Sequence, residues 1–241
     1  MNGFVLKADP RREETFSNEV RREYDQMSIV GKAFEPHDVK VEEKDDFVRI
    51  GRRFHAGPET FVEEYSRRGE KSYSSTILGL GRVIAIGEEK YFISKISNAF
   101  RTVTAATKDE MLDFIESQAY RFSAVFMPID YYTEFHSFPP QRGSIWYGQS
   151  ERLLMTNKYG IRPFFSSKYV EFDKFFFITP ESVEWLVKPD PRTGHRVRVS
   201  VVPNDEVRKF DVTCETVASL KIRDREAGVA FKLKEPPTPS S

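Results

Sequence analysis

Apolar residues recur with helical spacing near the start of the chain. Phe16, Val20, Tyr24 and Met27 follow one another at steps of four, four and three, which places them on one stripe of a helix. The spacing predicts an amphipathic helix over residues 15–27. Because one such helix is marginally stable alone, its stripe is expected to dock elsewhere in the fold. Residues 35–46 are mostly charged with scattered valines, which predicts an exposed linker or an edge strand.

Glycines punctuate the apolar region that comes next. Gly57-Pro58-Glu59 predicts the start of a short helix, since proline suits the first helical turn and acids favour its positive end. Residues 76–86 read TILGLGRVIAI, followed by Gly87-Glu88-Glu89 and then KYFISKIS. Two β-branched runs joined through a glycine-led turn predict a β-hairpin over this region.

The patterns of apolar and polar residues predict individual helices and strands more clearly in the second half of the chain. Thr107 and Glu110 fit a capping box that opens a helix ending near Arg121. An apolar strand follows at residues 123–127. The continuous apolar run at 174–179 predicts a strand covered on both faces. In residues 196–202 valines alternate with polar residues, which predicts a half-buried strand, and 210–233 read as two closing strands joined by a turn at 224–228.

The order of these elements from Thr107 to Leu233 resembles the apical domain and closing strands of tailed-phage major capsid proteins and encapsulin shell proteins. The resemblance implies an α+β fold with a mixed-sheet apical domain and a reduced peripheral domain carrying a β-hairpin. Before Thr107 no amphipathic pattern is long enough to be the spine helix of that family. The hairpin would correspond to the loop that reaches over a neighbouring subunit, or else to an ordinary meander within one domain.

The implied organisation has five parts. We expect a charged N-terminal arm with one helix over 1–46, a hairpin-bearing peripheral region over 47–105, and an apical-type domain over 106–205. Closing strands follow over 206–233, and a proline-rich disordered tail over 234–241. The implied function is a structural shell that self-assembles, not an enzyme. Its partners would be copies of itself, with a cargo enzyme or packaged DNA inside.

Composition narrows the classes of function. The 241 residues are 14% aromatic and 31% charged, which is typical of a folded chain. Lys plus Arg (37) equals Asp plus Glu (37), so the broad basic field of a dedicated nucleic-acid binder is missing. Four arginine pairs, at 11–12, 21–22, 52–53 and 67–68, lie near acids, which favours ion pairs over phosphate binding. Few Asn and Gln beside many Glu, Lys and Arg suggest a thermophilic source.

The sequence also sets expectations for compartment. We expect no signal peptide and no membrane span, hence a cytoplasmic shell or a virion. The single cysteine, Cys214, has no intramolecular disulfide partner and falls on a predicted strand, which favours an inert, buried thiol.

Candidate chemistry is sparse. Asp130, Glu134 and His136 would share one face of a strand and could converge on a metal ion, which leaves a metal-dependent hydrolase as an alternative. No nucleophile elbow, phosphate loop or metalloprotease histidine pair is present, and we expect no cofactor.

Aromatic loop residues suggest a contact surface instead. Phe138, Pro139, Trp146 and Tyr147 form segments that are unusually apolar for loops, and aromatic anchors are enriched at the centres of interfaces. They are the candidate assembly interface; the alternative is that they fold back on their own domain. A monomeric β-rich protein-binding module is a further alternative.

Overall fold

The computed structural model describes residues 7–34, 37–38, 46–57, 60, 79–105, 107, 110, 114, 117, 122–128, 164–171 and 173–234. Contacts within the chain define two compact units. Unit 1 comprises Met1–Gly31, Pro36–Glu88 and Leu186–Ser219, and unit 2 comprises Lys32–Glu35, Glu89–Trp185 and Leu220–Ser241. Each unit is therefore assembled from segments that lie far apart in the sequence.

Helix α1 (Pro10–Met27) is the predicted amphipathic helix, and it begins earlier than the apolar stripe does. Asp9 caps it by accepting a hydrogen bond from the backbone N–H of Arg11 at 2.9 Å, and proline occupies the first turn. Phe16, Val20 and Tyr24 are buried as the spacing predicts, but Met27 is 42% exposed and does not belong to the buried stripe. A short helix, α2 (Ile29–Ala33), follows Ser28.

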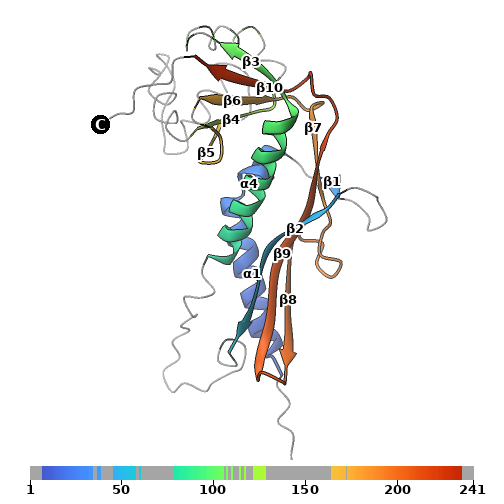
Figure 1. The fold of residues 1–241 in the computed structure, drawn as a ribbon. Helices are drawn as coiled ribbons and strands as arrows, with labels where there is room; N and C mark the ends of the chain where they lie inside the picture. The colour runs from blue at the N-terminus through green and yellow to red at the C-terminus, as the bar shows by residue number, and fades with distance from the viewer. Residues whose placement is uncertain are drawn as a thin grey trace, which may run out of the picture. The chain divides into compact units, whose positions relative to one another are not determined.

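Unit 1 is built on a sheet whose central strand is the long strand β9 (Lys209–Ile222). Strand β2 (Val48–Ala56) pairs antiparallel with one edge of β9, and β8 (Val197–Asn204) pairs antiparallel with its other edge. Strand β7 (Val183–Val187) also neighbours β9, and β1 (His37–Asp38) pairs parallel with β7 (Figure 1). The sequence predicted either an exposed linker or an edge strand for the charged segment 35–46. The part of this segment that the structure describes, β1, is an edge strand.

The predicted alternation of β8 is confirmed. Val197 and Val199 are at most 2% exposed, and Val201 packs against the same core. They meet the apolar stripe of α1, together with Phe210 and Val212 of β9. The helix and the sheet of unit 1 therefore share one hydrophobic core, which is the docking partner that the stripe of α1 required.

The hairpin predicted over residues 76–97 is wrong. Leu80–Ala99 form one continuous helix of 20 residues, α4. Its buried positions recur at steps of four, with Leu80, Ile84, Glu88, Phe92 and Ile96 all at most 4% exposed. Ala85 and Ile93 are buried beside them, but the buried stripe also contains the charged Glu88, and Val83 on the other face is 42% exposed. Because amphipathic contrast is absent, the sequence offered β-branched residues and glycines instead of a helical stripe.

The glycines of α4 allow close packing and do not form a turn. A Cβ at Gly81 would collide with the backbone of α1 at Val20 and Tyr24, and a Cβ at Gly87 would meet Ile50 of β2. The start of α4 is capped from another helix, since the Glu23 carboxylate accepts the N–H groups of Gly79 at 3.1 Å and Gly81 at 3.0 Å. No local capping residue was therefore needed.

Unit 2 contains a mixed five-stranded sheet, in agreement with the predicted mixed-sheet domain. In spatial order its strands are β3 (Arg101–Ala105), β10 (Val229–Leu233), β6 (Lys174–Ile178), β4 (Ala124–Pro128) and β5 (Phe164–Ser167). The two outer pairs are parallel, and the pairs β10–β6 and β6–β4 are antiparallel. Strands β4 and β6, both predicted, lie in its middle.

Aromatic rings fill the core of unit 2. The run Phe175–Ile178 of β6 is at most 1% exposed, which confirms a strand covered on both faces. Phe177 lies with its ring centroid 5.1 Å from that of Phe122 and 5.8 Å from that of Phe114. Phe114 is helical, as Glu110 is, and Thr107 Oγ1 accepts the Glu110 N–H at 3.2 Å, as the predicted capping box requires.

Candidate assembly surface

The candidate assembly interface of Phe138, Pro139, Trp146 and Tyr147 lies outside the described residues, and so do Asp130, Glu134 and His136. Both therefore stay predictions. Within the described ranges no group of three or more His, Cys, Asp or Glu side chains is placed to hold a metal ion. In those same ranges, no helix has both the length and the apolar character needed to cross a membrane.

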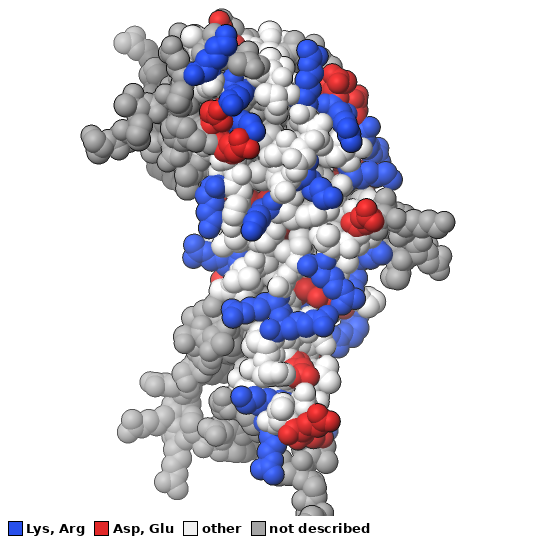
Figure 2. Space-filling model, in the orientation of Figure 1, with Lys and Arg blue, Asp and Glu red and all other residues white. Residues whose placement is uncertain are grey.

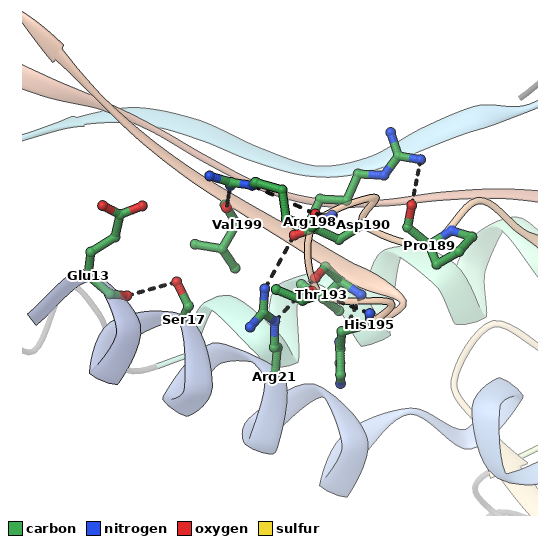
Figure 3. Close-up of polar contacts among 11 residues, drawn as sticks. Glu13, Ser17, Arg21, Pro189, Asp190, Thr193, His195, Arg198 and Val199 are labelled. Carbon is green, nitrogen blue, oxygen red and sulfur yellow. Dashed lines mark hydrogen bonds and ion pairs between the residues drawn. The ribbon is translucent and has the colours of Figure 1, made fainter. Parts of the chain in front are cut away.

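A buried aspartate fixes α1 to the loop between β7 and β8. Asp190 is 3% exposed and its carboxylate accepts from Arg21 Nη2 at 3.3 Å (Figure 3). Its other oxygen accepts the backbone N–H of Arg192 at 2.9 Å, and its carbonyl oxygen accepts the N–H of Gly194 at 2.8 Å. These donors offset the cost of burying the charge and tie the loop to α1.

Arginine side chains complete the same loop. Arg198 of β8 donates through Nη2 to the carbonyl oxygens of Lys188 at 2.9 Å and Pro189 at 3.0 Å, and Arg192 donates to the Val199 carbonyl at 2.9 Å (Figure 3). These charge-assisted bonds tie β8 to the loop that precedes it. No local pattern predicts this cluster, because its other members lie more than 160 positions from Arg21 in the sequence.

A second buried polar network lies between α1 and α4 within unit 1. Glu88 is fully buried and accepts from the Tyr24 hydroxyl at 2.8 and 2.9 Å and from the Ser28 hydroxyl at 2.7 Å. Ser28 Oγ in turn accepts the Gly31 N–H at 2.9 Å. Burial raises the pKa of Glu88 to about 7, while the bonds from Ser28 and Tyr24 and the charge of Arg196 partly oppose that rise.

The ion-pair interpretation of the arginine pairs is confirmed for one pair. Arg21 binds Asp190, as described above, and Arg22 binds Glu19 one turn earlier on α1, at 2.5 Å. Arg52 and Arg53 are exposed on β2. Figure 2 shows basic side chains spread over the drawn face with acidic side chains among them, in keeping with the equal totals of each sign.

The inert-thiol interpretation of Cys214 agrees with the structure. The side chain is fully buried in the core of unit 1, and burial raises the pKa of its thiol to about 12. A thiolate is the reactive form, and almost none is present at neutral pH.

The exposed end of the β8–β9 hairpin is the main apolar feature of the described surface of unit 1. Across the described residues, four large apolar side chains are more than 40% exposed: Met27, Val83, Val202 and Val207. Two of these four belong to one hairpin end. Beneath them, Phe210 and Val212 are buried, so the hairpin is anchored in the core.

Comparison with solved structures identifies the fold. The chain matches the virus-like particle protein of Pyrococcus furiosus with a TM-score of 0.62 and 12% identity, over 91% of this chain and 98% of that one. It matches a phage-related protein of Bordetella bronchiseptica with a TM-score of 0.56 and 9% identity, over 95% and 97%. The capsid protein of an empty GTA particle matches with a TM-score of 0.50 and 12% identity, over 83% and 94%.

The chain therefore has the α+β fold of phage-type capsid proteins, as the order of elements after Thr107 predicted. The similarity extends over most of the chain, beyond the region in which the sequence resemblance was visible. No protein-family model and no curated protein sequence matches it.

Proposed function

We propose that this chain is a structural shell protein whose copies assemble into a closed capsid or protein compartment. The observation that supports this most is the match to the Pyrococcus furiosus virus-like particle protein, which runs over 91% of this chain and 98% of that one. The shared fold therefore accounts for most of the length of both chains.

Buried polar contacts hold the elements of unit 1 together, which suits a subunit that assembles with copies of itself. Helix α1 is held to the sheet by the buried Arg21–Asp190 pair and to α4 by the Glu88 network. Rigid subunits lose less conformational entropy on association than flexible ones do. When different patches meet head to tail, repeated contacts close into rings, and each contact can be modest because many act together.

The finer parts of the proposal concern contacts and contents. Phe138, Pro139, Trp146 and Tyr147 would form one contact between copies, since apolar aromatic loops tend to be partner sites. The interior would hold a cargo enzyme or packaged DNA. Co-purification separates these contents: nuclease-sensitive nucleic acid indicates a virus-like role, and a stoichiometric second protein indicates a compartment.

The test of the function is the mass of the particle. The purified protein should elute far above its monomer mass of 28.0 kDa in size exclusion with light scattering, and electron micrographs should show hollow particles or rings. A sharp monomer at high protein concentration would contradict the proposal. The metal-dependent alternative is tested separately by elemental analysis of the purified protein, which should find no stoichiometric metal.

A further inference from the structure

Helix α4 has an exposed face on the side opposite its buried stripe. The buried positions recur at steps of four from Leu80, and two further residues turn an α-helix by about 200°. The positions on that opposite side are exposed, apart from the half-buried Ile86. Together with the adjoining and exposed Lys95 they form the exposed face of α4: Arg82, Ile86, Lys90, Ser94, Lys95 and Asn98.

The charges on this face are all positive. Arg82, Lys90 and Lys95 supply them, and the 20 residues of α4 include only two acids. Glu88 accepts the buried hydroxyl bonds described above. Glu89 is half-buried, and burial raises its pKa, although a serine of β5 and the lysine after it oppose that rise. Neither acid belongs to the exposed face of α4.

The three cations of this face have no acidic partners. Elsewhere in unit 2, Lys174 Nζ lies 2.7 Å from Glu171 Oε2, and Lys232 Nζ lies 3.2 Å from Asp173 Oδ2. Among the residues that the structure describes, no acid forms an ion pair with the three cations of α4. Unpaired like charges on one helix give a local positive potential, although the formal net charge of the chain is zero.

The other side chains of this face suit phosphate better than a protein surface. Ser94 and Asn98 are exposed hydrogen-bonding residues, and Lys95 Nζ lies 5.6 Å from the ring centroid of Tyr91, which attracts the ammonium group. Lysine and serine are depleted at protein–protein interfaces, whereas both commonly contact phosphate oxygens. The face also lacks an aromatic anchor of the kind that dominates protein interfaces.

The spacing of the cations matches a dense row of phosphates. At 1.5 Å per residue, Arg82 and Lys90 are about 12 Å apart along the helix axis, and Lys90 and Lys95 are about 7.5 Å apart. Duplex DNA carries one phosphate for about every 1.7 Å of its axis, so a duplex along α4 offers phosphates at both intervals. Three contacts per copy are weak, but many copies in one shell act together.

We propose that the exposed face of α4 binds the phosphate backbone of nucleic acid held inside the shell, through Arg82, Lys90 and Lys95. This inference rests on the proposed shell function. It chooses nucleic acid over a cargo enzyme as the contents, and it makes the exposed face of α4 part of the inner wall.

The first experiment measures nucleic acid inside purified particles. Wild-type particles are treated with nuclease, opened with denaturant, and the protected nucleic acid is quantified and then digested with DNase or RNase to identify it. The double variant Lys90→Gln with Lys95→Gln should form particles of the same mass that retain about tenfold less nucleic acid per subunit. Wild-type particles without protected nucleic acid, or variant particles that retain as much as the wild type, would overturn the inference.

The second experiment measures the contacts directly. The full chain, kept below the concentration at which particles form, is titrated against a labelled random-sequence DNA duplex at a series of salt concentrations, with fluorescence anisotropy as the signal. Each phosphate contact contributes about 0.9 to the slope of log K against log salt, so the double variant should lower the slope by about 1.8. Lys90→Arg with Lys95→Arg keeps both charges and should keep the slope. An unchanged slope in the glutamine variant would refute the contacts.

A matched control removes a lysine that already has a partner. Lys232→Gln takes one charge from the pair with Asp173 in unit 2 and should leave both the slope and the retained nucleic acid unchanged. If it lowers the slope as much per lysine as the α4 variant does, binding follows total charge, and the exposed face of α4 is not the site.

The outcomes separate this site from the shell itself. A wild type that stays monomeric contradicts the shell proposal, whatever it binds. Glutamine-variant particles of normal mass and normal nucleic acid content leave the shell proposal standing and refute the site. A folded glutamine variant that no longer assembles would show that the face is a contact between copies. Loss of a stoichiometric protein in place of nucleic acid would show a cargo surface. Both of these results also refute the inference.

Discussion

Glu88 should make the stability of this protein depend on pH in a defined direction. Its carboxyl is fully buried in α4, and burial raises its pKa from the usual 4.5 to about 7. The folded state therefore binds this proton more tightly than the unfolded state does. The corresponding stabilisation is complete below pH 4.5 and is lost as pH rises through 7. At about 1.36 kcal/mol per pH unit, the loss amounts to roughly 3 kcal/mol.

The variant Glu88→Gln isolates this contribution. Glutamine keeps an oxygen that can accept from Tyr24 or Ser28 and removes the ionisation. The free energy of unfolding of the variant, minus that of the wild type, should therefore increase by roughly 3 kcal/mol between pH 4.5 and pH 8. The assay is denaturant unfolding of both proteins at a series of pH values. Protein concentration is kept the same throughout, since assembly would add its own stabilisation.

Two further variants check the cause. Tyr24→Phe removes a hydrogen bond that lowers the pKa of Glu88, so the fall in stability should extend to higher pH and become larger. Glu14→Gln, at an exposed position on α1, is the matched control for the removal of one carboxylate. A difference between Glu88→Gln and the wild type that stays constant across the whole pH range would refute the reasoning.

The remaining predictions concern packing and buried charge. Gly51→Ala should lower the free energy of unfolding by roughly 1–3 kcal/mol, because the new Cβ would collide with the Cys214 carbonyl oxygen across the β2–β9 pair. Gly194→Ala should lower the free energy of unfolding by about 1 kcal/mol through its positive φ alone. Asp190→Ala should lower the free energy of unfolding by roughly 3–5 kcal/mol, because the partly buried Arg21 loses its carboxylate partner. Glu19→Ala, at the exposed pair with Arg22, should lower it by under about 0.5 kcal/mol. Equal losses in denaturant unfolding would contradict the structural role of the Arg21–Asp190 pair. The Cys214 thiol should resist a soluble thiol reagent in the folded protein and react fully once it is unfolded, so rapid native labelling would show that the core of unit 1 opens easily.

Much of the fold after Thr107 was predictable because its signals are local. The capping box lies within four residues. The KFFFI run of β6 predicts burial on both faces, and the alternation of valines in β8 predicts one buried face. The stripe of α1 was equally clear. Its true start was missed, although Asp9-Pro10 is a recognisable capping signal just before it.

Helix α4 shows why local patterns failed. Its starting N–H groups are capped by Glu23 of another helix, and its glycines are required by the close approach of α1 and Ile50. None of these partners is near α4 in the sequence. Its buried stripe contains the charged Glu88 and its exposed face carries Val83, so the sequence lacks the contrast between polar and apolar faces on which helix recognition depends.

The resemblance in the order of elements already implied the class of fold, and the described strands of the second half and the buried state of Cys214 follow from the pattern of neighbouring residues. Only the tertiary structure decided that residues 80–99 form a helix, that Asp190 meets Arg21, and that Glu88 is buried among hydroxyl groups. These depend on packing between segments more than 35 positions apart, and a single chain carries no local mark of which distant residue will come to lie against it.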